Sequence, residues 1–217
     1  MTTARPTSSS FASTPVKVRQ GDTKSSYRPF IVGIGGTSRT GSSSEKALAI
    51  SLKAAADGGA ETLLIPGPEL DLPMYNPSNS ERTPAAQRMI ETFRRCDGVI
   101  IASPAYHGSI SGLVKNALDY AEDMRADQRI YLDGLPIGCI ACAGGWQAAG
   151  QTLAALRAIA HALRGWPTPL GAMLNTSGRL FDESGACLDL SAKMQLETVG
   201  RQVLDFATKR QNTIMQG

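Results

Sequence analysis

The stretch that decides the fold covers residues 30–44, FIVGIG followed directly by GTSRTGSSS. Six apolar or small residues predict a buried strand, and the Gly, Ser and Thr residues after them predict a loop. The apolar pattern of residues 44–57 then predicts a helix, which Gly58 and Gly59 end. A strand that enters a helix through a short polar loop is the opening unit of an α/β domain.

Strands and helices alternate to the end of the chain. Further strands are expected at residues 61–65, 98–102, 135–143 and 170–174, and further helices at 84–96, 112–124, 147–163 and 190–209. Because the strands are apolar on both faces, they predict a parallel sheet covered by helices on both sides. The expected fold is a doubly wound five-stranded parallel sheet, either flavodoxin-like with strand order 2-1-3-4-5 or half of a Rossmann arrangement. A ligand is then expected in the loops after the first, third and fourth strands.

The positive charge of the chain is concentrated in an N-terminal leader. The 217 residues carry 22 Lys and Arg against 19 Asp and Glu, a formal net charge of +3. Residues 1–29 hold five basic side chains and one acidic one, which leaves 17 basic and 18 acidic side chains in residues 30–217. A nucleic-acid-binding domain usually gathers Lys and Arg on one face, and no basic run follows residue 30. Nucleic acid is therefore not an expected partner.

The composition of the leader predicts a disordered extension before a single domain of residues 30–210. Residues 1–28 are rich in Ser and Thr and poor in large apolar side chains, so burial cannot offset the entropy of ordering them. Such a composition, with Arg and few acids, is also that of an organelle transit peptide. No apolar run reaches the ~20 residues of a membrane span. We expect a cytoplasmic protein without a membrane partner, with organelle targeting by residues 1–28 as the alternative.

The loop after the first strand has the features of a phosphate site. It leads into a helix, whose first N–H groups and dipole favour a negative charge. Arg39 offers a two-pronged guanidinium that matches a phosphate. Three hydroxyl donors accompany it, namely Thr37, Ser42 and Ser44. The alternative is a flexible turn in which Ser43 or Ser44 only caps the helix.

The spacing of this loop argues against a nucleoside triphosphate and against a dinucleotide. A Walker A loop needs lysine where this chain has Ser42. A dinucleotide fingerprint that begins at Gly33 has Ser38 at its third glycine position. We therefore expect a monophosphate held by hydroxyls, one arginine and a helix N-terminus.

The loop after the third strand suits the edge of a planar heterocycle. Residues 103–112 are SPAYHGSISG, in which Pro104 stiffens the backbone and Gly108 allows close approach. Tyr106 adds a flat face beside exposed backbone amides. A serine hydrolase is not expected, because no serine here lies in a G-x-S-x-G elbow. His107 has no partner near it in sequence that would complete a catalytic triad.

The loop after the fourth strand suits the other side of the same ligand. Residues 143–147 are AGGWQ, and the two glycines let the backbone lie against a ligand. Trp146 is expected to stack on the ligand or cover it, with a place in the hydrophobic core as the alternative.

These loops resemble the NADPH-dependent FMN reductase family, the flavodoxin-like flavin, quinone and azo reductases. Residues 36–42, GTSRTGS, resemble the family's GSxRxxS phosphate loop. Residues 103–120, SPAYHGSISGLVKNALDY, resemble its SPxYxxSxxGxLKNxLDW stretch. Residues 71–75, DLPMY, are similar to the family's loop after the second strand. The resemblance covers residues 30–175 and implies the flavodoxin-like strand order.

The resemblance implies FMN as the cofactor and indicates the residues that hold it. By position, Thr37, Arg39, Ser42 and Ser44 would hold the phosphate, Pro104, Ala105, Tyr106, His107, Gly108 and Ser109 would line the isoalloxazine, and Gly144, Gly145 and Trp146 would close its other side. The cofactor would carry the chemistry, so no catalytic side chain and no metal are expected. His107 stands where the family commonly has asparagine, so it is expected to tune the ring or contact the substrate.

The implied activity is that of an FMN-dependent NAD(P)H oxidoreductase of the flavin reductase type. NADPH or NADH would deliver hydride to the flavin N5, and electrons would pass to free flavin, a quinone-like acceptor or O2. A flavin-dependent monooxygenase is one candidate partner, and a homodimer or homotetramer is implied. Two alternatives stay open. One is a dedicated FMN-dependent dehydrogenase or reductase of one small cyclic metabolite, with a pocket formed by His107, Trp146 and residues 175–188. The other is a flavodoxin-type electron-transfer protein.

Other conspicuous residues are interpreted as structural. Cys139 and Cys142 form a C-x-x-C pattern, but within a strand positions i and i+3 point to opposite faces, so the two thiols should not meet. His161 is expected on a helix surface. A solvated helix face is expected for Asp119, Glu122 and Asp123.

Overall fold

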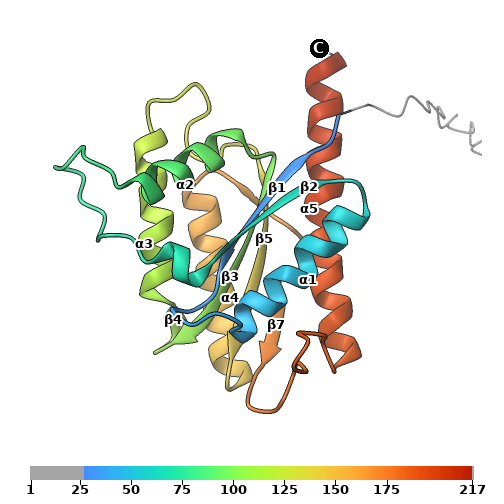
Figure 1. Cartoon of the computed structure of the whole chain (residues 1–217). Helices are drawn as coiled ribbons and strands as arrows, with labels where there is room; N and C mark the ends of the chain where they lie inside the picture. The colour runs from blue at the N-terminus through green and yellow to red at the C-terminus, as the bar shows by residue number, and fades with distance from the viewer. Residues whose placement is uncertain (1–26, 217) are drawn as a thin grey trace, which may run out of the picture.

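The centre of the molecule is a parallel β-sheet (Figure 1). The structure is a computed structural model that describes residues 27–216, so nearly all of the leader predicted to be disordered lies outside the described residues. The four long strands are β1 (Phe30–Gly35), β2 (Glu61–Pro66), β3 (Gly98–Tyr106) and β5 (Pro136–Ala143). They lie in the order β2-β1-β3-β5, as expected for the first four strands.

The sheet differs from the expected five strands in two places. The fifth strand consists of two short pieces, β6 (Trp166–Pro167) and β7 (Ala172–Asn175), which both pair in parallel with β5. In the gap between them the Leu170 amide donates to Gln202 Oε1 of the C-terminal helix at 2.9 Å instead of to β5, which interrupts the strand. In addition, β4 (Ser109–Ile110) folds back antiparallel onto the end of β3. The α/β class and the doubly wound arrangement hold.

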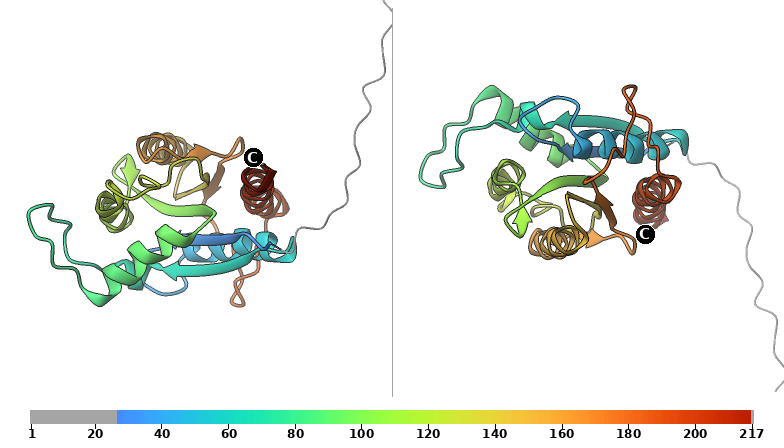
Figure 2. Two further views of the ribbon diagram at one scale, coloured as in Figure 1. Left: turned by 90° about the horizontal axis from the view of Figure 1, so that it is seen from above. Right: turned by 90° about the horizontal axis from the view of Figure 1, so that it is seen from below.

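Helices cover both faces of the sheet, as predicted. One face carries α1 (Ser43–Asp57) and α5 (Leu190–Gln216), and the other carries α2 (Pro84–Arg95), α3 (Gly112–Asp119) and α4 (Trp146–Ala162). Figure 2 shows α1 and α5 side by side. Gly200 permits this contact, because a Cβ there would lie 2.0 Å from the carbonyl oxygen of Ser51.

Two 3-10 helices complete the described structure. η1 (Gly67–Leu70) follows β2, and η2 (Tyr120–Met124) continues α3. The helix expected over residues 112–124 therefore tightens from an α-helix to a 3-10 helix at Tyr120.

The C-x-x-C pattern lies within β5, as predicted. Cys139 packs in the hydrophobic cluster on one face of the sheet and Cys142 packs in the cluster on the other face. Burial raises the pKa of each thiol to about 12. The two cysteines are therefore unreactive core residues and not a redox pair.

The two ends of the described chain meet at Asp97, just before β3. This carboxylate is 8% exposed and accepts hydrogen bonds from the hydroxyl of Tyr27, from Phe30 N at 2.8 Å and from Gln211 Nε2 at 2.6 Å. Tertiary contacts thus begin three residues before the domain start expected at residue 30, and α5 runs past the expected end at residue 210. No helix within residues 27–216 is both long and apolar enough to cross a membrane.

Candidate functional site

The predicted site residues lie at one edge of the sheet, where β1, β3 and β5 end. These strands are parallel neighbours, and Gly35 pairs with Ala102 while Pro104 pairs with Cys142. The amide of Gly36 donates to the carbonyl of Ala102 at 3.3 Å, which ties the first loop to β3. This edge is at the bottom of Figure 1, where β4 and β7 are labelled. The expectation that the three loops meet at the carboxyl ends of the strands is correct.

The loop between β1 and α1 is folded around its own side chains. Thr37 Oγ1 accepts a hydrogen bond from Arg39 N at 3.1 Å and donates to the Arg39 carbonyl at 3.2 Å. Ser42 is the N-cap of α1, since its Oγ accepts from Glu45 N at 3.3 Å. The Glu45 carboxylate in turn accepts from Gly41 N at 3.1 Å. The helix is therefore capped by Ser42, and not by either of the two serines after it that the sequence suggested as caps.

Several donors of this loop have no acceptor within the protein. Among residues 27–216, the Arg39 guanidinium makes no hydrogen bond or ion pair, and the amides of Ser43 and Ser44 in the first turn of α1 have no acceptor. Arg39 is exposed, whereas Ser44 is 1% exposed and its hydroxyl lies 3.3 Å from that of Ser42. A cation and unpaired amides at the positive end of a helix dipole are suited to bind an anion.

Gly67 supports this loop and was not among the residues predicted from the sequence. A Cβ at position 67 would lie 1.9 Å from the Thr37 carbonyl oxygen and 2.6 Å from its amide nitrogen. Only glycine therefore lets the start of η1 come this close to the loop. The sequence signal was a glycine between Pro66 and Pro68, which by itself indicates no more than a turn.

The loop after β3 is a tight hairpin that presents an aromatic and an imidazole side chain. Tyr106 of β3 pairs with Ser109 of β4, so His107 and Gly108 form the turn. Their φ values are 50° and 88°, and two positive values are what a two-residue type I′ turn requires. The Tyr106 side chain is 52% exposed, and His107 is exposed beside it.

Buried hydroxyls fix this hairpin in place. Ser103 is fully buried, and its Oγ donates to the Pro104 carbonyl at 2.8 Å and accepts from Ser111 N at 3.0 Å. From α4, Thr152 Oγ1 donates to the Ser109 carbonyl at 3.3 Å. Pro104 is buried and Ala105 is half-buried, so these two residues form the base of the hairpin. Neither Ser103 nor Thr152 was predicted, although Ser103 opens the motif that carries the family resemblance.

The loop after β5 leaves open space beside its backbone. A Cβ at Gly144 or Gly145 would have no neighbour within 4 Å. Gly145 is the N-cap of α4, and Trp146, the first residue of that helix, is 61% exposed. The alternative that placed Trp146 in the core is therefore wrong, and its indole is free to contact a ligand.

The loop between β2 and α2 is held by α3 and η2. The buried Asn116 side chain donates to the carbonyls of Leu72 and Pro73 at 3.1 and 3.0 Å and accepts from Tyr75 N at 2.8 Å. Asn116 lies within the predicted family motif, but its role was not foreseen.

An ion pair fixes the far end of the same loop. Arg82 donates to both oxygens of Asp123, at 2.6 and 2.8 Å, and its guanidinium lies 5.0 Å from the centre of the Tyr75 ring. The hydrogen bonds from Arg82 lower the pKa of Asp123. The prediction that Asp123 is simply solvated is therefore wrong.

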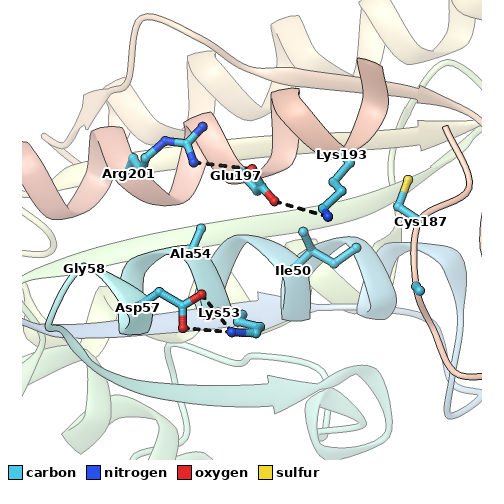
Figure 3. A pocket seen from close by; sticks show the side chains of 10 residues that line it. Ile50, Lys53, Ala54, Asp57, Gly58, Cys187, Lys193, Glu197 and Arg201 are labelled. Carbon is cyan, nitrogen blue, oxygen red and sulfur yellow. Dashed lines mark hydrogen bonds and ion pairs between the residues drawn. The ribbon is translucent and has the colours of Figure 1, made fainter. Parts of the chain in front are cut away.

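A separate hollow lies between α1 and α5, away from these loops (Figure 3). It measures about 610 Å³, and none of the predicted cofactor residues lines it. Its charged side chains are already paired: Lys53 with Asp57 at 2.7 Å, and Glu197 with Lys193 at 3.8 Å and with Arg201 at 3.4 Å. We therefore assign no site to it. Within the described part of the chain, no three His, Cys, Asp or Glu residues are grouped so as to hold a metal ion.

Comparison with known proteins decides the family. The model of the family described as NADPH-dependent FMN reductase matches residues 29–178, well over half of the chain. The chain belongs to this family. The matched segment contains β1 to β7 and thus all three loops at the carboxyl edge of the sheet.

Two curated relatives are similar over part of their length. The chain is 34% identical over 76 residues to NADPH azoreductase of Bacillus sp. (strain OY1-2), which is 35% of this chain and 39% of the relative. It is 30% identical over 128 residues to FMN-dependent NADPH-azoreductase of Staphylococcus aureus, which is 59% of this chain and 64% of the relative. The matched part is less than two thirds of either relative.

Solved structures bear out the flavodoxin-like fold. The flavoenzyme NAD(P)H:(acceptor) oxidoreductase FerB from Paracoccus denitrificans superposes with a TM-score of 0.69 at 20% identity, covering 83% of this chain and 98% of that chain. A flavodoxin, the WrbA-like protein from Agrobacterium tumefaciens, superposes with a TM-score of 0.57 at 14% identity, with coverage of 83% and 98%. At these identities the likeness concerns the fold alone.

Proposed function

We propose that this protein is an FMN-dependent oxidoreductase that takes hydride from NADPH or NADH and passes electrons to a small-molecule acceptor. One observation carries the proposal: within the segment that matches the family, a loop with unpaired anion donors and a hairpin with exposed aromatic and imidazole side chains share one edge of the sheet. FMN has a phosphate and a planar ring and requires both kinds of surface.

The loop between β1 and α1 would hold the FMN phosphate. Arg39 supplies the positive charge, and the amides of Ser43 and Ser44 supply donors at the positive end of α1. Thr37 is half-buried and its hydroxyl bonds the Arg39 backbone, whereas Ser42 and Ser44 are buried with their hydroxyls 3.3 Å apart, so these three side chains would shape the loop beneath the phosphate. Because Thr37 already braces the Arg39 backbone, the loop needs little reordering to bind.

The two other loops would hold the isoalloxazine. Its edge would meet the backbone of residues 104–109, and the open space at Gly144 and Gly145 would admit its face. Trp146 would exclude water from that face. When bound, FMN accepts hydride from the nicotinamide and returns the electrons to the acceptor. The side chains of the site bind and orient it.

The acceptor we propose is a quinone or an azo compound, since two relatives are named as azoreductases. A flavin-dependent monooxygenase supplied with reduced flavin is the alternative partner. We also propose that the protein assembles as a homodimer or homotetramer and acts in the cytoplasm.

The direct test is anaerobic reduction of the purified protein with bound FMN. We expect NADPH or NADH to remove the visible flavin absorbance, and an added quinone to restore it. If the protein binds no FMN, the proposal is wrong. If FMN binds but neither nucleotide reduces it, a dedicated FMN-dependent dehydrogenase of one small metabolite or a flavodoxin-type electron carrier is favoured instead.

A further inference from the structure

His107 carries the one imidazole among the proposed site residues, and imidazole is the side chain that most often acts as a general acid or base. The chain has two histidines. The other, His161, lies in the last turn of α4, whereas the first turn of that helix is at the carboxyl edge of the sheet. His161 is therefore separated from the carboxyl edge of the sheet by most of the 17-residue helix α4. Only His107, in the turn between β3 and β4, is near the proposed flavin site.

The backbone at His107 is held in a conformation that few residues other than glycine adopt. Its φ of 50° is in the left-handed region, which Asn and Gly fill more readily in such a turn. The hairpin is fixed on both sides, by Ser103 from β3 and by Thr152 from α4. The imidazole is therefore presented from a rigid support and not from a flexible loop.

The imidazole has no partner within the described residues. Neither ring nitrogen takes part in a hydrogen bond or an ion pair there. The neighbouring titratable side chain on the hairpin is Tyr106, and α4 presents Gln151 and Thr152, which are both uncharged. The charged side chains at the proposed phosphate loop are Arg39, on the loop after β1, and Glu45, in the first turn of α1. Both ring nitrogens of His107 are thus available to a bound molecule.

We propose that His107 is the general acid that protonates the reduced acceptor, an assignment that rests on the proposed function. Hydride transfer to a quinone leaves one oxygen as an anion, and transfer to an azo compound leaves one nitrogen as an anion. In the next step an N–H bond of the His107 imidazolium breaks, an O–H or N–H bond of the product forms, and the neutral imidazole regains a proton from water. The substrates favoured by this site are therefore acceptors that take a hydride and then a proton, in contrast to acceptors that take single electrons.

The test compares two acceptors in the FMN-loaded His107→Asn variant. Asparagine tolerates a positive φ, so the turn is retained. With NADPH as donor, we expect kcat/KM for a benzoquinone to fall by about 100-fold, the usual contribution of a general acid. Reduction of ferricyanide, which needs no proton, should keep its rate. The pH profile of the quinone rate should change in the variant and should stay as in the wild type in the control His161→Asn.

Flavin affinity and the visible flavin spectrum of the same samples provide readouts independent of turnover. If His107→Asn binds FMN normally and keeps the wild-type quinone rate and pH profile, His107 is not the acid. If it slows both acceptors equally, its role is structural, and the proposal is again overturned. If the wild-type protein does not bind FMN, the proposed function and this inference fall together.

Discussion

Gly67 sets the distance between the start of η1 and the loop that follows β1. The position has no space for a side chain, since a Cβ would lie 1.9 Å from the backbone oxygen of Thr37. A backbone oxygen cannot rotate away as a side chain can, so any larger residue must displace the loop itself. That loop carries the unpaired Arg39 guanidinium.

We therefore predict that Gly67→Ala weakens FMN binding by roughly tenfold, or about 1.4 kcal/mol. The cause is displacement of Thr37, which braces the Arg39 backbone. Fluorescence titration with FMN measures the effect, and circular dichroism checks that the variant is folded. Gly178→Ala is the control, because a Cβ there meets nothing within 4 Å. Equal affinity in the two variants would refute the role given to Gly67.

At the scale of single residues, the sequence predicted which loops form the site but not the role of each side chain in them. Three consecutive serines lie where the helix begins, and which of them caps it depends on the residue at which the helix starts. The structure gives that role to Ser42 and buries Ser44. The roles of Gly67 and Asp123 depend on contacts with residues distant in the chain, which a local pattern does not contain.

At the scale of elements, the long loop between β2 and α2 takes its shape from α3 and η2. Asn116 binds three backbone groups near its start, and Asp123 binds Arg82 near its end. The Arg82 and Asp123 side chains are 11% and 22% exposed, so solvent screens this pair less than an ordinary surface pair. We expect the ion pair to contribute measurably to stability.

The predicted effect of Asp123→Asn depends on pH. Arg82 lowers the pKa of Asp123 in the folded protein. The ion pair therefore contributes its full stabilisation at pH values above 3.8, the ordinary pKa of this carboxyl group, and loses it as the pH falls through the lowered pKa of the folded protein. We expect the substitution to reduce the free energy of unfolding by about 1–2 kcal/mol at neutral pH. The difference from wild type should shrink below about pH 4. Urea unfolding at pH 7 and pH 3 tests this, and a pH-independent difference would contradict it.

Element prediction succeeded where hydrophobic runs were long and failed where turns decided the outcome. Three of the four long strands, β1, β3 and β5, are mostly apolar and buried, and they were recognised from that property. The hairpin of β3 and β4 was missed because its turn is His107-Gly108, and the usual sequence signal is Asn-Gly or Asp-Gly. The end of α5 was placed at residue 209 because its last two turns are mostly polar.

At the scale of the whole molecule, Asp97 joins the chain ahead of β1 to the last third of α5. Its position before β3 is at the amino edge of the sheet, whereas the candidate site is at the carboxyl edge. The stability of the domain and the binding of FMN are therefore expected to respond separately to changes at Asp97. The sequence did not reveal this link, because its partners Tyr27 and Gln211 are 184 positions apart.

Tyr27→Phe is predicted to reduce the free energy of unfolding by about 1–2 kcal/mol, because it removes a hydrogen bond to the buried Asp97 carboxylate. FMN affinity should not change. Thermal or urea unfolding measures the first quantity, and a flavin titration measures the second. The matched control is Tyr131→Phe. The Tyr131 hydroxyl bonds the more exposed Glu122, so its removal should reduce the free energy of unfolding by a smaller amount. A loss of FMN affinity in Tyr27→Phe would show that the two edges of the sheet are coupled.

The central claim is that Arg39 and the first turn of α1 hold the phosphate of FMN. The most direct measurement compares FMN with riboflavin, which has the same ring but no phosphate, in wild-type protein and in Arg39→Ala. Removal of one charge-assisted contact should weaken FMN binding by about 1.5–3 kcal/mol and leave riboflavin binding unchanged. Arg125→Ala, which removes an exposed arginine that none of the proposed site loops contains, serves as the control. An FMN affinity that is the same in Arg39→Ala as in wild type would contradict the account.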